Sequence, residues 1–285
     1  MAEPLTLRLM TRDEVDWWFG LPGHEGWNPG LHDADTYWAA DPEGLVAAEI
    51  AGELIGGGAI IRYGGSFGAL GHVVVHPQTR GRGIEDQLWR ACLQLLRGRL
   101  QPGATIGLDG VSQDRSRYVD AGFVFSHRTI RYETTGAAGP IRDGMVPADG
   151  VGVEAIAGFD GRCFPVPRKR FVSTWLQVVD GLALACRQAG RLRGYGVIRR
   201  SREGARLEPL LADDATVAEN LLDSLLTFAP HEPVFLDVPE TNAWAMALAR
   251  RRRMHPVSSR GRLYRGPAPR VAEARIFGDS TFSLG

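Results

Sequence analysis

One segment of the 285-residue chain combines residue types that could bind an anion. A run of valines leads through His76 into the turn Arg80-Gly81-Arg82-Gly83, and apolar residues recur at helical spacing from Ile84. The first amides of a helix have no partner within it, and the helix dipole adds positive potential there. Glycine also lets the backbone approach a ligand closely. The pattern predicts a phosphate or pyrophosphate site, or a tight turn that serves the structure alone.

The elements around this segment alternate between strand and helix patterns, which predicts an α/β or α+β fold with helices packed on a sheet. For the first half, we expect strands over 5–9, 44–50, 53–63, 67–76, 105–111 and 123–132, and helices from 11, over 84–100 and over 114–120. For the second half, we expect helices over 168–177, 216–228 and 242–253, and strands over 182–187, 192–200, 233–238 and 261–264.

A stretch rich in Gly, Pro and Ala divides these two series. It predicts an N-terminal domain over 1–135, a linker over 136–150 and a C-terminal domain over 151–285. The two series have a similar order, which suggests a diverged duplication. The Gly/Arg turn is not repeated in the second half. The corresponding segment before the helix over 216–228 is LEPLLAD (207–213), which contains neither Gly nor Arg.

Composition narrows the function classes. The chain has 33 basic and 33 acidic side chains and a pI near 7.1, which argues against nucleic acid or an anionic membrane as a partner. Its three cysteines are far apart and show no C-x-x-C spacing, so we expect no disulfide framework and no metal site. The N-terminal residues lack a signal-peptide pattern, and a reduced, cytoplasmic setting is expected.

The turn and many separated segments resemble the GNAT (GCN5-related) acyltransferases, in particular the YitH-like group of tandem GNAT proteins. The segments include HEGWNPGLHDA (24–34), IGLDG (106–110), YVDAGF (118–123), PLLAD (209–213) and GDSTFSLG (278–285). The resemblance implies tandem α/β (α+β) folds, each a mixed, mostly antiparallel sheet that is flanked by helices and splayed between its fourth and fifth strands. It also implies a degenerate second copy whose terminal strand returns to the N-terminal domain.

The resemblance further implies that the first domain binds acetyl-CoA or another acyl-CoA as cosubstrate. The backbone of Val73, Val74 and Val75 would hold the pantetheine arm. The amides of Arg80, Gly81, Arg82, Gly83, Ile84 and Glu85 would hold the pyrophosphate. Glu85 stands where the family has a small residue, and it places a negative charge near a polyphosphate.

Acyl transfer to an amine needs a proton for the leaving sulfur and a group that accepts the amine proton. The resemblance makes Tyr118 the candidate general acid. Ala69 occupies the position of the glutamate base found in histone-modifying members, so His72 and His24 are the base candidates, with water as the alternative.

The acceptor side is expected to include Trp18, Trp27 and Asn28. Clustered aromatic rings of this kind suit an apolar or cationic acceptor, or they simply form a hydrophobic core under a long loop.

The sequence thus predicts an acyl-CoA-dependent N-acyltransferase acting on a small-molecule or peptide amine by direct transfer in a ternary complex. The alternative is a catalytically silent acyl-CoA-binding or regulatory protein. We expect a monomer or homodimer.

Overall fold

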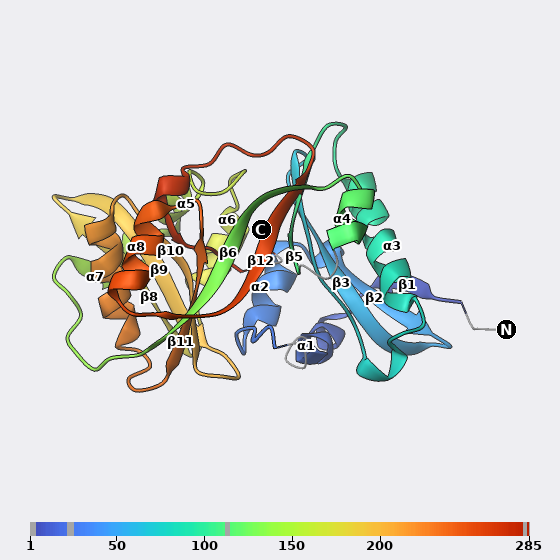
Figure 1. Ribbon diagram of the computed structural model, residues 1–285, viewed down its shortest axis with the longest axis horizontal. Helices are drawn as coiled ribbons and strands as arrows, with labels where there is room; N and C mark the ends of the chain where they lie inside the picture. The colour runs from blue at the N-terminus through green and yellow to red at the C-terminus, as the bar shows by residue number, and fades with distance from the viewer. Residues whose placement is uncertain (1–3, 22–25, 112–114, 282–283, 285) are drawn as a thin grey trace.

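The computed structural model describes residues 4–21, 26–111, 115–281 and 284 (Figure 1). Its helices are α1 (Arg12–Gly20), α2 (Asp33–Ala40), α3 (Ile84–Arg99), α4 (Arg115–Asp120), α5 (Val153–Asp160), α6 (Lys169–Trp175), α7 (Ala215–Leu226) and α8 (Ala243–Arg251). Its strands are β1 (Thr6–Leu9), β2 (Leu45–Ile50), β3 (Glu53–Tyr63), β4 (Phe67–Val75), β5 (Thr105–Gly110), β6 (Val124–Thr135), β7 (Met145–Pro147), β8 (Gly181–Gln188), β9 (Arg191–Arg200), β10 (Ala205–Ala212), β11 (Pro233–Pro239), β12 (His255–Arg265) and β13 (Ile276–Gly278).

These strands form one sheet whose order has an internal symmetry. The order is β1-β2-β3-β4-β5-β12-β6-β11-β10-β9-β8-β7, and β13 pairs with β10. Counted from the two ends, β1 to β5 correspond to β7 to β11, and β12 corresponds to β6. Each half therefore takes the strand beside its fifth from the other half. This arrangement fits the duplication suggested by the sequence.

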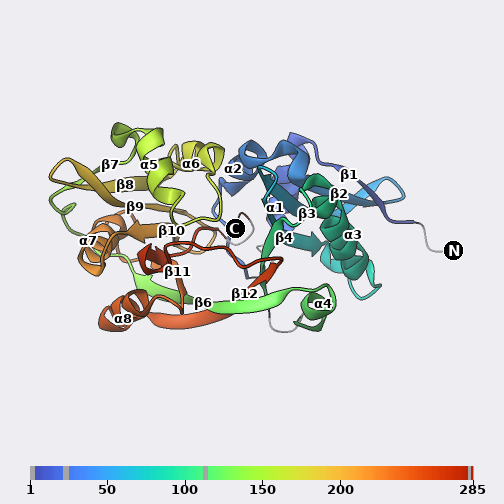
Figure 2. The same ribbon diagram turned by 90° about the horizontal axis from the view of Figure 1, so that it is seen from above.

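The exchanged strands β6 and β12 are long and antiparallel, and they run from one half of the molecule to the other (Figures 1 and 2). Their register extends from the pair His255 and Glu133 to the pair Tyr264 and Val124. β12 also pairs with β5, and β6 also pairs with β11. The main-chain hydrogen bonds consequently continue across the middle of the molecule.

The helices cover the two faces of this sheet differently. On one face, α1 and α2 of the first half and α5 and α6 of the second half share one hydrophobic core, which includes Trp18, Phe67, Phe164 and Trp175. On the other face, α3 and α4 cover the first half, and α7 and α8 cover the second half, each with a core of its own. The shared core lies where the two halves meet.

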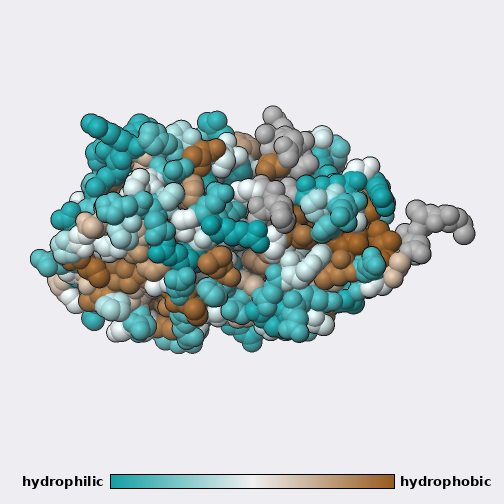
Figure 3. Space-filling model, turned by 90° about the horizontal axis from the view of Figure 1, so that it is seen from below, coloured by the Kyte–Doolittle hydropathy of each residue, from teal (hydrophilic) through white to brown (hydrophobic). Residues whose placement is uncertain are grey.

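Exposed apolar side chains are spread over the surface. They include Trp17, Leu31, Phe125 and Trp244, which come from separate elements. On the face shown in Figure 3, hydrophobic residues form several patches that hydrophilic residues separate. Scattered exposed apolar residues of this kind are normal for a folded protein.

Most expected elements are present, and five were not anticipated. These are α2, α5, β7, β10 and β13. The segment 136–150 contains β7, which pairs with β8 at the edge of the sheet. β10 occupies the residues expected as a connection, because its charged side chains Arg206 and Glu208 are buried as ion pairs.

Buried charges cluster where β6, β10, β11 and β12 meet. Asp237 accepts hydrogen bonds from Arg131, Arg206 and Arg260, at 2.9, 2.8 and 2.6 Å. Burial opposes the ionisation of Asp237, but the three guanidinium groups hold its pKa below the ordinary range. One carboxylate therefore joins strands that come from both halves of the chain.

A second set of contacts joins α2 to the second half. Arg199 donates to both carboxylate oxygens of Asp33, at 2.6 and 2.9 Å. Its Cζ lies 4.1 Å from the centroid of the Trp175 ring. Burial opposes the ionisation of Asp33, yet the neighbouring Arg199 lowers its pKa. The helices of the shared core are thus fixed across the junction.

We expect Asp237→Asn to destabilise the protein by about 3–5 kcal/mol, because three buried arginines lose their shared carboxylate. Urea unfolding measures this loss. Glu154→Gln is the control, since Glu154 and its partner Lys169 are both exposed, and it should leave the free energy of unfolding essentially unchanged. Equal stability of the two variants would contradict a structural role for the cluster.

Candidate functional site

The sheet opens between β4 and β5. These parallel strands pair only from Phe67 and Thr105 to Ala69 and Gly107. Beyond that point β4 continues against β3, and β5 continues against β12. The remaining residues of β4 and β5 thus border a gap in the sheet, which we call the first gap.

A bulge in β4 lies beside the first gap. Val74 pairs with Gly57 and Gly71 pairs with Ala59, so His72 and Val73 together stand opposite Gly58 alone. His72 has a φ of 49°, in the left-handed region. Such bulges leave backbone groups outside the sheet ladder and redirect side chains.

The backbone of β4 beyond the bulge alternates between its two edges. The amide of His76 donates to the Ile55 carbonyl on β3 at 2.7 Å. Because successive residues of a strand turn their polar groups to opposite edges, Val74 faces β3, whereas Val73 and Val75 face the first gap. Main-chain donors and acceptors are therefore available on that side.

The Gly/Arg turn leads from β4 into the N-terminus of α3. Gly81 and Gly83 have φ values of 75° and 73°, which glycine adopts without strain. Gly83 is the N-cap residue and offers no side chain to the first amides of the 16-residue helix. The structure therefore combines open helix amides with the strand that borders the first gap.

Side chains at this helix start carry both signs of charge. Arg80 lies 3.8 Å from Glu85, and both are partly exposed. Asp86 contacts Arg90 at 2.7 Å and Arg117 at 3.3 Å. The charge of Glu85 is thus partly offset by the arginine next to it in space.

Tyr118 lies on α4, and its ring packs against the end of β5. It is buried, and its ring lies 5.9 Å from the ring of Trp89 on α3. A Cβ on Gly110 would come within 2.3 Å of the Tyr118 ring, so the glycine at the end of β5 allows the ring to pack there. The Tyr118 ring therefore packs between α3 and the end of β5, the strand that borders the first gap.

His72 points to the opposite face of the sheet from α3, into the shared core. The rings of Trp18, Phe19, Trp27 and Tyr37 have centroids 5.1–5.5 Å from its ring. Its Nδ1 is 3.2 Å from the Tyr37 hydroxyl, which also lies 2.9 Å from the Thr281 hydroxyl. Burial lowers the pKa of His72 to about 4, so the imidazole is neutral at physiological pH.

The other expected acceptor residues have different environments. Trp18 is buried, and among the described residues its indole nitrogen has no hydrogen-bond partner. Asn28 hydrogen-bonds Ser201 and the backbone of Glu203, which makes it a contact between the halves. His24 lies outside the described residues.

The second half has a corresponding gap that is closed. β10 and β11 are parallel and pair only from Ala205 and Val234 to Leu207 and Leu236. Beyond this point β13 pairs with β10, at the pairs Leu210 with Gly278 and Leu211 with Ile276. The chain itself therefore occupies the space that is open in the first half.

The helix start beside the second gap is closed as well. Asp214 is the N-cap of α7, and its carboxylate accepts the Val217 amide at 2.9 Å. A carboxylate at this position satisfies the amides and repels a second anion. The helix that corresponds to α3 thus has no open anion site.

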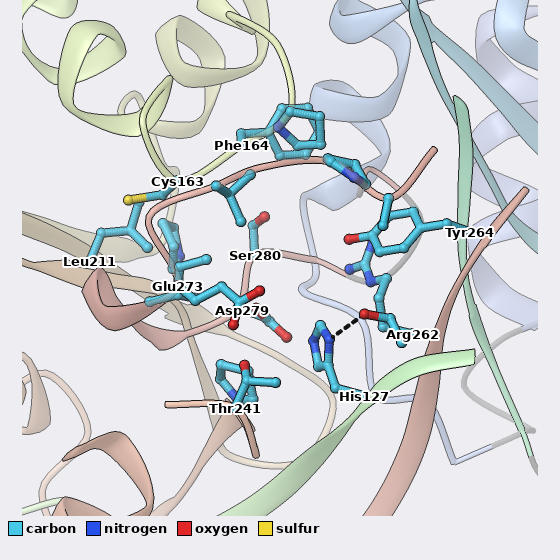
Figure 4. Close-up of a pocket in the computed structure, with 18 of the residues that line it drawn as sticks. His127, Cys163, Phe164, Leu211, Thr241, Arg262, Tyr264, Glu273, Asp279 and Ser280 are labelled. Atoms are coloured by element: carbon cyan, nitrogen blue, oxygen red, sulfur yellow. Dashed lines mark hydrogen bonds between the residues drawn. The ribbon is translucent and has the colours of Figure 1, made fainter. Parts of the chain in front are cut away.

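A cavity of about 110 Å³ lies between the two halves, and the sequence predicted none of its lining residues as site residues. His127, Arg262 and Tyr264 line it from β6 and β12, and Glu273 and Asp279 line it from the segment after β12 (Figure 4). The pairing of β12 with β6 places Arg262 opposite His127, and no local sequence pattern predicts this pairing.

Two further properties of the described residues bear on function. They include no group of three or more His, Cys, Asp or Glu placed to hold a metal ion. None of the helices in this part of the chain is both long and apolar enough to cross a membrane.

Comparisons with known proteins agree with the geometry. Residues 11–115 match the model of the acetyltransferase (GNAT) family, and residues 156–278 match that of an acetyltransferase (GNAT) domain. A holothin acyltransferase from Pseudoalteromonas sp. (strain SANK 73390) is 24% identical over 268 residues, which cover 92% of this chain and 88% of that protein.

Two solved structures share the fold. A putative acetyltransferase from Pyrococcus horikoshii superposes with a TM-score of 0.83 at 22% identity, covering 99% of this chain and 96% of that one. A tandem GNAT protein from the clavulanic acid biosynthesis pathway gives a TM-score of 0.64 at 14% identity, covering 93% of this chain and 100% of that one.

The buried state of His72 predicts a pH dependence of stability. Between pH 6.5 and pH 4 the histidine binds a proton in the unfolded chain but stays neutral in the native protein. Stability is therefore fully present above pH 6.5, and about 3 kcal/mol of it is lost as the pH falls towards 4.

Urea unfolding at several pH values measures this dependence. His72→Asn is the comparison, because asparagine tolerates a positive φ and does not titrate in this range. The variant should lose less stability than the wild type on acidification. Parallel curves for the two proteins would show that His72 is not the titrating group.

Proposed function

Because the chain belongs to the GNAT superfamily of acyltransferases, with one such domain in each half, we propose that it transfers an acyl group from acyl-CoA to an amine, with the chemistry in the first half. Acetyl-CoA is the simplest donor. The observation that carries this proposal is the first gap, which joins strand backbone groups to an uncapped helix N-terminus.

The donor would lie along β4. The backbone of Val73 and Val75 would pair with the pantetheine amides, and the amides of residues 80–85 would face the pyrophosphate. Gly81 and Gly83 leave the space that the phosphates need, and the guanidinium groups of Arg80 and Arg82 add charge-assisted contacts.

The reaction is a direct transfer in a ternary complex. The bound thioester supplies an activated carbonyl carbon, at which a C–N bond forms while the C–S bond breaks. The amine loses one proton, and the leaving sulfur takes one from the Tyr118 hydroxyl. Backbone N–H groups at the bulge in β4 would stabilise the negative charge on the carbonyl oxygen.

His72 is the candidate group that accepts the proton of the amine. His72 is neutral, as a base must be, and it is one of the two residues that form the bulge in β4. Its ring is enclosed by four aromatic side chains, so it would act through Tyr37 and Thr281 rather than by direct contact with the solvent. Water bound near the acceptor is the alternative to this route.

The second half would bind no CoA, since β13 fills its gap and Asp214 caps α7. We therefore expect one CoA per chain. A protein that binds acyl-CoA without turning it over is the second candidate, and Glu85 at the helix start is the observation that favours it.

The acceptor would be a small-molecule or peptide amine. The similar Pseudoalteromonas protein bears the name holothin acyltransferase, which supports acyl transfer to an acceptor as the function of this chain.

We expect Tyr118→Phe to lower kcat about 100-fold, because the sulfur loses its proton donor, while the Kd for acetyl-CoA changes little. Free-thiol release measures turnover, and calorimetry measures binding. Unchanged turnover would remove Tyr118 from this role, and a protein that binds acetyl-CoA but transfers nothing would favour the silent alternative.

Removal of the charge at Glu85 should tighten CoA binding. A like charge about 8 Å from a phosphate in water costs about 0.5 kcal/mol, so Glu85→Gln should lower the Kd about twofold at low ionic strength. Glu154→Gln, far away in the second half, is the matched control. Weaker binding by the Glu85 variant would contradict the repulsion.

A further inference from the structure

The cavity between the halves lies next to the first gap, where an acceptor would have to bind to reach a donor on β4. It is lined by residues from both halves, and Figure 4 shows Glu273, Asp279, Tyr264, Arg262 and His127 around a common space. Phe164 closes its upper side in this view. Its residues come from β6, β12, the segment after β12 and the loop after α5.

The cavity adjoins the point where β4 and β5 separate. A Cβ on Gly107, which belongs to the last β4–β5 pair, would lie 3.1 Å from the Phe67 ring and 3.3 Å from the Tyr264 ring. The Phe67 ring is also 5.5 Å from that of Phe164. Two cavity residues thus lie next to the strand residues that open the first gap.

The charges of the cavity favour a cation. Arg262 pairs with Asp109 at 2.9 Å, and Arg168 pairs with Asp160 at 2.8 Å, so the charges of both lining arginines are already balanced. Among the described residues no ion pair holds Glu273 or Asp279. Asp279 accepts a hydrogen bond from Thr129 at 2.7 Å.

The remaining titratable groups add no positive charge to the lining. Burial and the nearby Arg262 lower the pKa of His127, which favours its neutral form. Burial raises the pKa of Asp279, and Arg262 and Arg260 oppose this rise. A positively charged ligand would favour the ionised carboxylate further.

Asp109 supplies an independent sign of a missing partner. It follows Gly107 by two residues on β5, so both face the side of the sheet on which Tyr264 and Arg262 lie. Its Oδ2 pairs with Arg262, whereas among the described residues its buried Oδ1 has no hydrogen-bond partner. An unsatisfied buried carboxylate oxygen is costly, and a ligand N–H group would satisfy it.

Building on the proposed function, we propose that this cavity is the acceptor site and that the acceptor is a compact amine with a second positively charged group. The carboxylates of Glu273 and Asp279 hold the distal ammonium. The reacting amine lies towards Asp109 Oδ1 and the first gap. A cavity of about 150 Å³ holds benzene, so about 110 Å³ suits one end of a short diamine.

The test compares two amines of equal length. 1,4-Diaminobutane carries the second ammonium, and 1-aminopentane has a methyl group in its place. With acetyl-CoA as donor, kcat/KM should favour the diamine at least about tenfold. Asp279→Asn and Glu273→Gln should each reduce this preference by lowering kcat/KM more for the diamine than for 1-aminopentane, and the Kd for acetyl-CoA should stay unchanged.

The control is Glu240→Gln. Glu240 stands between the lining residues Pro239 and Thr241, but its carboxylate binds Arg128 outside the cavity, so the preference should stay as in the wild type. Equal kcat/KM values for the two amines, or variants that slow both amines alike, would overturn the proposal. Since Glu273 is exposed, its variant tests the site even if Asp279→Asn fails to fold.

A binding measurement tests the site even if the protein acylates neither amine. Calorimetric titration of 1,4-diaminobutane into the CoA-saturated protein should show binding that Glu273→Gln weakens. No binding to the wild type would overturn the acceptor site. Failure of acetyl-CoA itself to bind would instead overturn the proposed function, so the two failures are distinguishable.

Discussion

The pairing of β6 with β12 is the constraint on which the rest of the structure depends. Each of these strands begins beside the core of one half and ends beside the other, and each pairs with the fifth strand of the partner half. A strand that pairs on both edges cannot shift its register without breaking two ladders. The relative position of the halves is therefore set by main-chain hydrogen bonds rather than by side-chain contacts alone.

Buried ion pairs add side-chain contacts between the two halves to these main-chain hydrogen bonds. Asp237 gathers arginines from β6, β10 and β12, and Arg199 reaches from β9 to α2. Buried ion pairs contribute little net stability compared with apolar packing, but they tolerate few alternative geometries. Their position at the junction suits a protein in which residues from both halves must meet around one cavity.

The sequence predicts the elements of this fold better than their contacts. The strand expected over 53–63 is β3, and the helix expected over 84–100 is α3 to within one residue, because runs of strand-forming residues and helical periodicity are local signals. β10 lacks such a signal, since Arg206 and Glu208 resemble solvent-exposed residues until their partners are known.

For the candidate site, too, the sequence predicts local features better than contacts between distant residues. The Gly/Arg turn can be recognised from consecutive residues, and the positions of its glycines at positive φ agree with that interpretation. The surroundings of His72 and of Asp279 depend on residues far apart in the sequence. Tyr37 and Thr281 are 244 positions apart, and Thr129 and Asp279 are 150 positions apart. No pattern within a window of the sequence contains that information.

β13 gives the second half a property that the first half lacks. β13 belongs to the same chain as the gap that it fills. Its binding is therefore intramolecular, and its effective concentration does not change when the protein is diluted. Asp279 follows β13 directly, so the strand that fills the second gap also fixes the position of one residue in the wall of the cavity.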